Sequence, residues 1–164
     1  MGLINTEPPN PGNRFSSFIA ARNVPGFRTG FGWLVGQPRL RRTRLVLGDL
    51  FADRSLLDGE FDEFFLQPLT TNNELLAAAS KVLKSFDMKK HVNHLASIHP
   101  QIDAPVQLVW GDQDPFFPVA QAREMVSTFA NAELSEIKGS GLFCHEEDPA
   151  AVAAALLPTL TRAR

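Results

Sequence analysis

The sequence predicts an α/β protein with parallel strands flanked by helices, and three observations support this. Residues 104–110 form a short apolar run with β-branched members, typical of a strand buried on both faces. From residue 102 onward, strand and helix patterns alternate as strand–helix–strand–helix. Asp148 followed by Pro149 is typical of a helix start, with a capping carboxylate and a proline in the first turn.

The elements follow in order along the chain. Residues 1–4 are apolar and predict the end of a strand, and the prolines and glycine of residues 6–12 predict a loop. Residues 73–95 predict a helix capped by Asn72 or Asn73, although the register weakens after Asp87, where a second helix is an alternative. The remaining predictions are a helix over 118–129, a strand over 132–137 and a helix from 149 to about 157.

Composition narrows the classes of protein. The chain has 164 residues, 44% hydrophobic and 21% charged, with a formal net charge of −2, which suits one domain or part of a larger one. This balance argues against nucleic-acid binding, which requires an excess of basic residues. Apolar runs such as residues 152–157 are far shorter than the roughly 20 residues that span a bilayer. The single cysteine favours a reducing, cytoplasmic compartment.

Candidate catalytic residues follow the two predicted strands. Active sites of open parallel sheets lie beyond the carboxyl ends of the strands, here in the loops of residues 111–118 and 139–149. The first loop contains Asp112 and Asp114, and the second contains His145. An acid after one strand and a histidine after the next follow the order of the acid–base pair in a hydrolase triad, where the carboxylate orients the imidazole.

These loops carry a resemblance to a known family. Residues 102–115 (IDAPVQLVWGDQDP) resemble the acid strand and loop of α/β-hydrolases, and residues 139–149 (GSGLFCHEEDP) resemble their histidine loop. The branch most similar contains haloalkane dehalogenases, epoxide hydrolases and related C–C or ester hydrolases. The resemblance implies a partial α/β-hydrolase fold, with a strand end and loop entering a cap (1–12), a helical cap (13–100) and the C-terminal strand–helix–strand–helix portion of the core (101–164).

The resemblance also implies an activity and its residues. It implies a cofactor-free hydrolase of a small, largely apolar substrate, such as an ester, a carbon–halogen compound or an epoxide. Asp114 would be the triad acid, and the alternative is an Asp turn that closes the strand. Asp112 is interpreted as a solvated or loop-capping side chain. Glu7 is a weaker second candidate for the acid.

Two departures from the family pattern weigh against catalysis by this chain alone. Where most relatives carry the catalytic histidine, after the second glycine of the loop, this sequence has Leu142. His145 either replaces that base or is a surface residue. If Leu142 occupies the ancestral position, it should face Asp114 while His145 points away.

The second departure is the nucleophile. The glycine-bounded frames at residues 26–30 and 32–36 have neither Ser, Asp nor Cys at their centres, so the nucleophile elbow is expected upstream of Met1. Cys144 is interpreted as a small buried thiol. The alternative function is therefore a non-catalytic remnant or binding module that self-associates or pairs with another chain.

Other chemistry has weaker support in the sequence. Asp87, His91 and His94 would share one helix face, but no fourth ligand accompanies them, so solvated side chains are favoured over a metal site. We expect neither a metal nor a cofactor. Several phenylalanines would suit an apolar substrate pocket, although core packing is the simpler interpretation: Phe61, Phe64, Phe65, Phe116 and Phe117.

Overall fold

Three parallel strands form a sheet at the centre of the molecule. The computed structural model describes residues 1–6, 8 and 13–162. The strands are β1 (Gly2–Ile4), β2 (Val106–Gly111) and β3 (Ala132–Ile137). They lie in the order β1-β2-β3, with Leu3 opposite Leu108 and Leu108 opposite Leu134. The predicted α/β class is therefore confirmed, and the three predicted strands are present.

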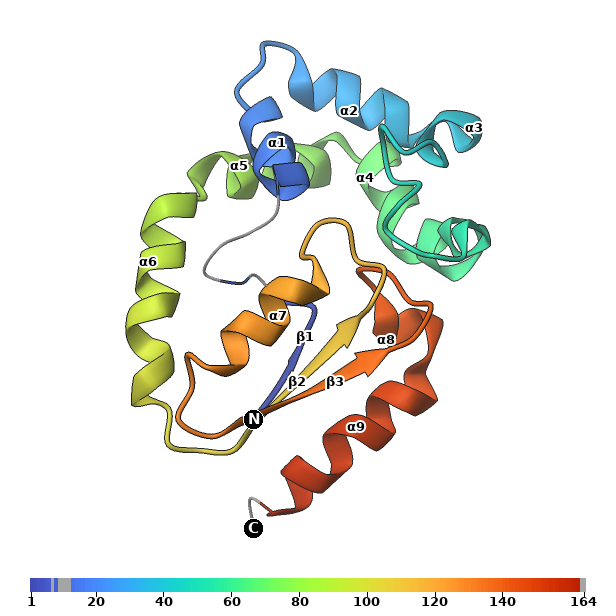
Figure 1. Cartoon of the computed structure of the whole chain (residues 1–164). Helices are drawn as coiled ribbons and strands as arrows, with labels where there is room; N and C mark the ends of the chain where they lie inside the picture. The colour runs from blue at the N-terminus through green and yellow to red at the C-terminus, as the bar shows by residue number, and fades with distance from the viewer. Residues whose placement is uncertain (7, 9–12, 163–164) are drawn as a thin grey trace.

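Helices surround this sheet, and most of them lie between β1 and β2 in the sequence. Their bounds are α1 (Asn13–Ala21), α2 (Phe27–Val35), α3 (Pro38–Arg41), η1 (Arg54–Leu57), η2 (Asp62–Leu66), α4 (Gln67–Thr71), α5 (Asn73–Ser85), α6 (Met88–Ile98), η3 (His99–Gln101), α7 (Val119–Val126), α8 (Cys144–Glu147) and α9 (Pro149–Arg162). Figure 1 shows α1 to α5 above the carboxyl ends of the strands, while α6 descends beside the sheet. The helical segment, residues 13–101, thus covers the carboxyl ends of the strands, where the site residues were expected.

The sheet is buried on both faces because β2 sends alternate side chains to opposite sides. Val106, Leu108 and Trp110 pack with residues of α7, whereas Val109 packs with residues of α8 and α9. All six residues of β2 are buried. The polar Gln107 is tolerated there because its amide donates to the carbonyl of Leu108 at 3.0 Å.

The structure corrects several predicted element bounds. The predicted 73–95 helix is two helices, α5 and α6: the backbone is extended at Phe86, after α5, and Asp87 caps α6 by accepting from the backbone N–H of Lys90 at 3.0 Å. The 118–129 helix is shorter and ends at Val126, while α9 continues past residue 157 to Arg162. Asn72 caps α5 as predicted, accepting from the N–H groups of residues 74 and 75.

The helical segment has a small core of its own beside the sheet core. Val35, Leu47, Phe51, Leu57 and Leu66 are buried together. A partly buried ion-pair network accompanies them: the buried guanidinium of Arg41 lies 3.0 Å from the Asp58 carboxylate and 2.5 Å from that of Asp62. These carboxylates raise the pKa of Arg41, chiefly through the hydrogen bond to Asp62.

The division of the chain into a strand end and loop (1–12), a cap (13–100) and a core portion (101–164) stays a prediction.

Candidate functional site

The loops after β2 and β3 are joined where the two strands end. Asp112 accepts from the backbone N–H of Gly139 at 2.8 Å, and the N–H of Gln113 donates to the carbonyl of Ser140 at 2.9 Å. A side chain at Gly111 would meet the carbonyl oxygens of Ser140, at 2.5 Å, and of Gly141. Glycine is therefore required at 111 for this close approach. Asp112 is the loop-capping residue that the sequence suggested.

Asn5 connects the ends of all three strands, and the sequence analysis did not single it out. Its amide Nδ2 donates to Asp114 Oδ2 at 2.7 Å, and its Oδ1 accepts from the N–H of Gly111 at 3.1 Å and from the Cys144 thiol at 3.0 Å. The residue is buried with φ of 35°, a left-handed conformation that Asn tolerates better than most residues. A polar residue directly after the apolar run of residues 1–4 was the available signal.

Asp114 lies at the carboxyl end of β2, and its side chain is buried. Its Oδ1 accepts from the backbone N–H groups of Phe116 at 2.8 Å and Phe117 at 3.0 Å, so the Asp turn that was the alternative to a catalytic acid is present. Burial raises the pKa of Asp114 above its usual value, and the hydrogen bonds from Phe117, Asn5 and Phe116 lower it in part. The carboxylate is held in one orientation by three donors, as a positioning acid requires.

His145 lies away from this carboxylate. Its side chain is 42% exposed, and its Nε2 lies 3.7 Å from a carboxylate oxygen of the adjacent Glu146. Its ring meets that of Phe143 edge-on, with centroids 5.8 Å apart. The hydrogen bonds described for Asp114 come from Asn5 and backbone N–H groups, and none joins it to His145. This arrangement does not bring together the two residues predicted as an acid–base pair.

Leu142 occupies the inner side of the same loop. It packs against the sheet core that contains Phe116 and Phe117, and its N–H donates to the carbonyl of Leu50 at 3.0 Å. The loop therefore places an apolar side chain next to the acid loop and an imidazole in solvent. Whether Leu142 holds the ancestral position of the base stays a prediction.

Cys144 and Glu147 complete the polar contacts at the strand ends. The Cys144 side chain is fully buried, and burial, with the nearby Glu147 and Asp114 carboxylates, raises the pKa of the thiol to about 11. A neutral thiol of this kind is a poor nucleophile. Glu147 accepts from the N–H groups of Ala52 at 2.7 Å and Gly141 at 2.5 Å, which ties the helical segment to the histidine loop.

The remaining candidates do not form a site within the described residues. Asp87 caps α6, and the His91 ring lies tilted against that of Phe86, with centroids 5.0 Å apart. No group of three potential metal ligands occurs in the part of the chain that the structure describes. Glu7 lies outside the described residues. Of the helices in the described ranges, none has the length and hydrophobicity that a bilayer crossing requires.

An apolar cavity of about 630 Å³ opens beside the acid loop. It lies between α1, α2 and residues 44–46, and Phe116 lines it together with Phe18, Phe27, Phe31 and Leu34. Its size and apolar walls suit a small organic ligand. The phenylalanines were predicted to line an apolar pocket or to pack in the core, and this holds only in part. Phe116 and Phe117 are buried, but Phe64 and Phe65 are 63% and 55% exposed and line neither a core nor this cavity.

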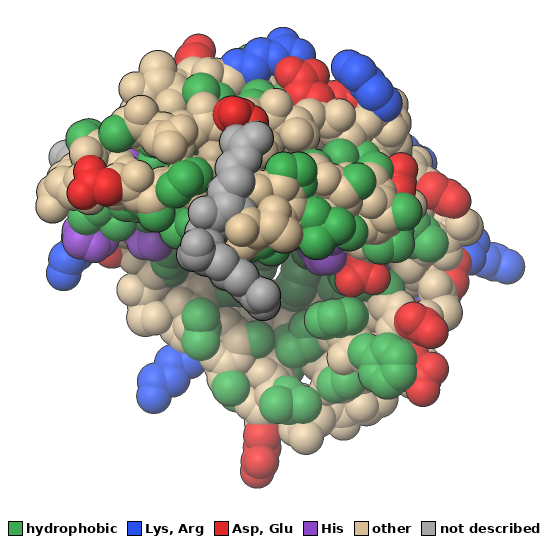
Figure 2. Space-filling view, turned by 90° about the horizontal axis from the view of Figure 1, so that it is seen from below, with side chains coloured by type: hydrophobic (Ala, Val, Ile, Leu, Met, Phe, Trp, Pro, Cys, Tyr) green, Lys and Arg blue, Asp and Glu red, His purple; other side chains and the backbone are tan. Residues whose placement is uncertain are grey.

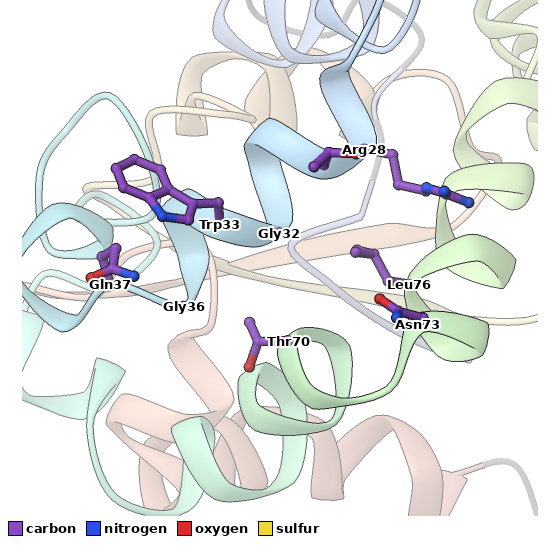
Figure 3. A pocket seen from close by; sticks show the side chains of 9 residues that line it. Arg28, Gly32, Trp33, Gly36, Gln37, Thr70, Asn73 and Leu76 are labelled. Atoms are coloured by element: carbon purple, nitrogen blue, oxygen red, sulfur yellow. The ribbon is translucent and has the colours of Figure 1, made fainter.

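A second pocket lies within the helical segment alone. Figure 3 shows Trp33 and Gln37 on one side of it and Thr70 and Asn73 on the other. Its lining comes from α2, α4 and α5 and the turns beside them, and includes no residue of the loops after β2 and β3. It is therefore separate from the Asp114 region.

Solved structures share this architecture along most of the chain. A protein from Burkholderia ambifaria described as having the α/β hydrolase fold superposes with a TM-score of 0.64 at 19% identity, over 96% of this chain and 55% of that one. The chain has the fold of part of an α/β-hydrolase. A membrane phospholipase A described as a bacterial virulence factor gives a TM-score of 0.55 at 18% identity, over 98% of this chain and 48% of that one.

A third neighbour is a serine hydrolase from Cycloclasticus zankles, with a TM-score of 0.52 at 14% identity, over 76% of this chain and 48% of that one. The chain therefore spans about half the length of these three proteins. No known protein family and no curated protein sequence matches it.

Proposed function

We propose that this chain is the cap and C-terminal portion of a hydrolase that acts on a small, largely apolar substrate. The observation that carries the proposal is the buried carboxylate of Asp114, held by three donors at the end of β2, beside a loop that lines an apolar cavity. Esters, carbon–halogen compounds and epoxides are the substrate classes. The two loop motifs, residues 102–115 and 139–149, support placing the chain in the haloalkane dehalogenase and epoxide hydrolase branch.

In this proposal Asp114 orients the base and stabilises its charged form. The base is assigned to His145, which reaches Asp114 only if the loop of residues 142–147 rearranges. The nucleophile comes from a segment outside this sequence, because neither glycine-bounded frame carries Ser, Asp or Cys at its centre. The substrate occupies the cavity lined by Phe116.

The test is hydrolysis by the chain joined to the segment encoded directly upstream of it in its genome. Short esters, haloalkanes and epoxides are the substrates, and Asp114→Asn should lower kcat/KM by a factor on the order of 10³ to 10⁴. Asp112→Asn, two residues away in the same loop, is the matched control and should keep most of the activity. Absence of hydrolysis in the joined protein, or equal losses in both variants, contradicts the hydrolase proposal.

A second candidate function is a non-catalytic binding module. The exposed, Glu146-paired side chain of His145 and the leucine at residue 142 favour it. The purified chain alone should then bind apolar compounds without turnover of any of the three substrate classes. Saturable hydrolysis by the chain alone that Asp114→Asn abolishes would rule out this function.

We further propose that the chain pairs with itself or with another chain in a cytoplasmic compartment. Among the described strands, β1 pairs with β2 alone, and an unpaired strand edge invites association. Leu157 and Leu160 of α9 are 57% and 51% exposed. Figure 2 shows hydrophobic side chains gathered around a hollow on the face seen from below. Sedimentation as a well-folded monomer at micromolar concentration would contradict this pairing.

A further inference from the structure

Three arginines converge on one carboxylate in the helical segment. Arg14 Nη1 lies 2.8 Å from Asp49 Oδ2, while Arg44 Nε and Arg54 Nη2 lie 3.4 Å and 3.5 Å from Asp49 Oδ1. The Asp49 side chain is only 16% exposed. Three positive charges therefore face one negative charge, and this arginine cluster (Arg14, Arg44, Arg54 and Asp49) has an excess of two positive charges.

All members of the arginine cluster except Arg14 line a polar pocket of about 320 Å³. Arg44, Asp49 and Arg54 are the charged residues in its lining, and Gln113 and Pro115 complete the side toward the sheet. These last two residues flank Asp114 in the sequence. The pocket is thus positive and lies against the acid loop.

The apolar cavity adjoins this polar pocket. Arg44 lines both, and Arg14 lines the apolar cavity with its guanidinium 5.2 Å from the centroid of the Phe116 ring. The other walls of the apolar cavity are mainly aromatic and aliphatic side chains, including Phe18, Phe27 and Leu34. One end of the combined space is therefore apolar and the other carries guanidinium groups.

We propose that this combined space binds an amphiphilic anion, with an apolar tail in the cavity and a single anionic head on Arg44 and Arg54. The side chains of these arginines are 77% and 47% exposed, so most of their N–H donors face the pocket or solvent, whereas Arg14 is held by Asp49 and by the Arg44 carbonyl. The guanidinium fork matches carboxylate and phosphate oxygens. The inference deepens the proposed function, and rests on it, by naming a substrate class: small apolar compounds that carry an acidic group.

Calorimetric titration of the purified chain tests the head and the tail separately. Octanoate and octyl phosphate supply the two kinds of head, octanol removes the charge, and acetate removes the tail. We expect saturable binding of octanoate or octyl phosphate, at least about tenfold tighter than that of octanol and acetate. The tighter of the two anions identifies the head.

Amino-acid substitutions test which residues bind the anionic head and the apolar tail. The double variant Arg44→Gln/Arg54→Gln should weaken binding of the anion at least about tenfold, while Arg39→Gln, an exposed arginine outside both pockets, should leave it unchanged. Gly30 lines the apolar cavity, and a side chain there meets no atom within 4 Å. Gly30→Phe should therefore block the tail, whereas Gly30→Ala keeps the space and controls for the change in helix propensity.

Equal affinities for octanoate, octyl phosphate and octanol would overturn the inference, as would equal losses in the double variant and in Arg39→Gln. Acetate binding as tightly as octanoate would also overturn it, because the tail would then contribute nothing. These outcomes are distinct from failure of the proposed function, since the titrations do not require turnover. Hydrolysis of neutral substrates only, by the joined protein, would contradict the inference while leaving the hydrolase proposal standing.

Discussion

The sheet with its flanking helices (the sheet half) and the helical segment are each stabilised by a different kind of contact. In the sheet half, hydrogen bonds join residues far apart in the sequence, and the Asn5–Asp114 bond spans 109 positions in a buried environment. In the helical segment, many of the polar contacts are local: Asn72 caps α5, Asp87 caps α6, and α5 has no fully buried residue. The sheet half therefore depends on a few buried polar contacts, and the helical segment on many small contributions.

The largest expected effect is loss of the Asn5 side chain. Asn5→Ala removes the donor to Asp114 and the acceptor shared by the Gly111 N–H and the Cys144 thiol, so three buried polar groups lose this partner, and it places Ala at positive φ. We expect a loss of about 4 kcal/mol in the free energy of unfolding, measured by urea denaturation. Asn131→Ala, at an exposed asparagine, is the control. A loss below about 1 kcal/mol for Asn5→Ala would show that the strand ends do not depend on this residue.

A slightly smaller effect is expected at Gly111. Gly111→Ala drives a methyl group into the backbone carbonyls of Ser140 and Gly141, which cannot move without separating the two loops. We expect destabilisation by about 3 kcal/mol, the upper range for overpacking. Gly30→Ala introduces the same methyl group into open space on α2 and should be neutral or mildly stabilising. Similar denaturation midpoints for Gly111→Ala and Gly30→Ala would show that the sheet half is no more sensitive to an added methyl group than the helical segment.

A pH-dependent effect is expected from Cys144. Its pKa is raised from the ordinary 9.0 to about 11 in the folded chain, so the folded state holds the thiol proton more tightly than the unfolded state. The resulting stabilisation is fully present below about pH 9 and is lost as pH rises through about 11. The free energy of unfolding should therefore fall more steeply over this range in the wild type than in Cys144→Ala. Parallel pH profiles would contradict a buried, protonated thiol.

The smallest effect is expected in the helical segment. Asn72→Ala removes the cap that accepts from the N–H groups of Glu74 and Leu75, and should cost about 1 kcal/mol. Circular dichroism and urea denaturation measure the loss, and Asn73→Ala, one residue further along, is the matched control. If Asn72→Ala destabilised the chain as much as Asn5→Ala, the helical segment would be as sensitive to single contacts as the sheet half.

Local sequence patterns are enough to predict the elements around the strands and the two loops that carry the candidate site. Burial on both faces of a parallel sheet produces continuous apolar runs, and these alternate with helical patterns, so β2, β3, α7 and α9 could be predicted within a few residues. Asp148 caps α9 as predicted, because a capping contact joins near neighbours: its carboxylate accepts from the Ala151 N–H at 2.9 Å. Asp114 could be named as a candidate site residue because active sites lie at the carboxyl ends of parallel strands.

Only the tertiary structure decided which side chains meet. Asn5, Asp114 and Cys144 are brought together from three separate segments, and no local pattern encodes a contact across more than 100 residues. The sequence left two alternatives for His145, a replacement base or a surface residue, and the structure favours the second: a short helix, α8, begins at Cys144 and leaves the imidazole exposed while Leu142 packs inward. Local chemistry sets caps and periodicity, whereas long-range packing decides the pairing of polar groups and the shape of the cavities.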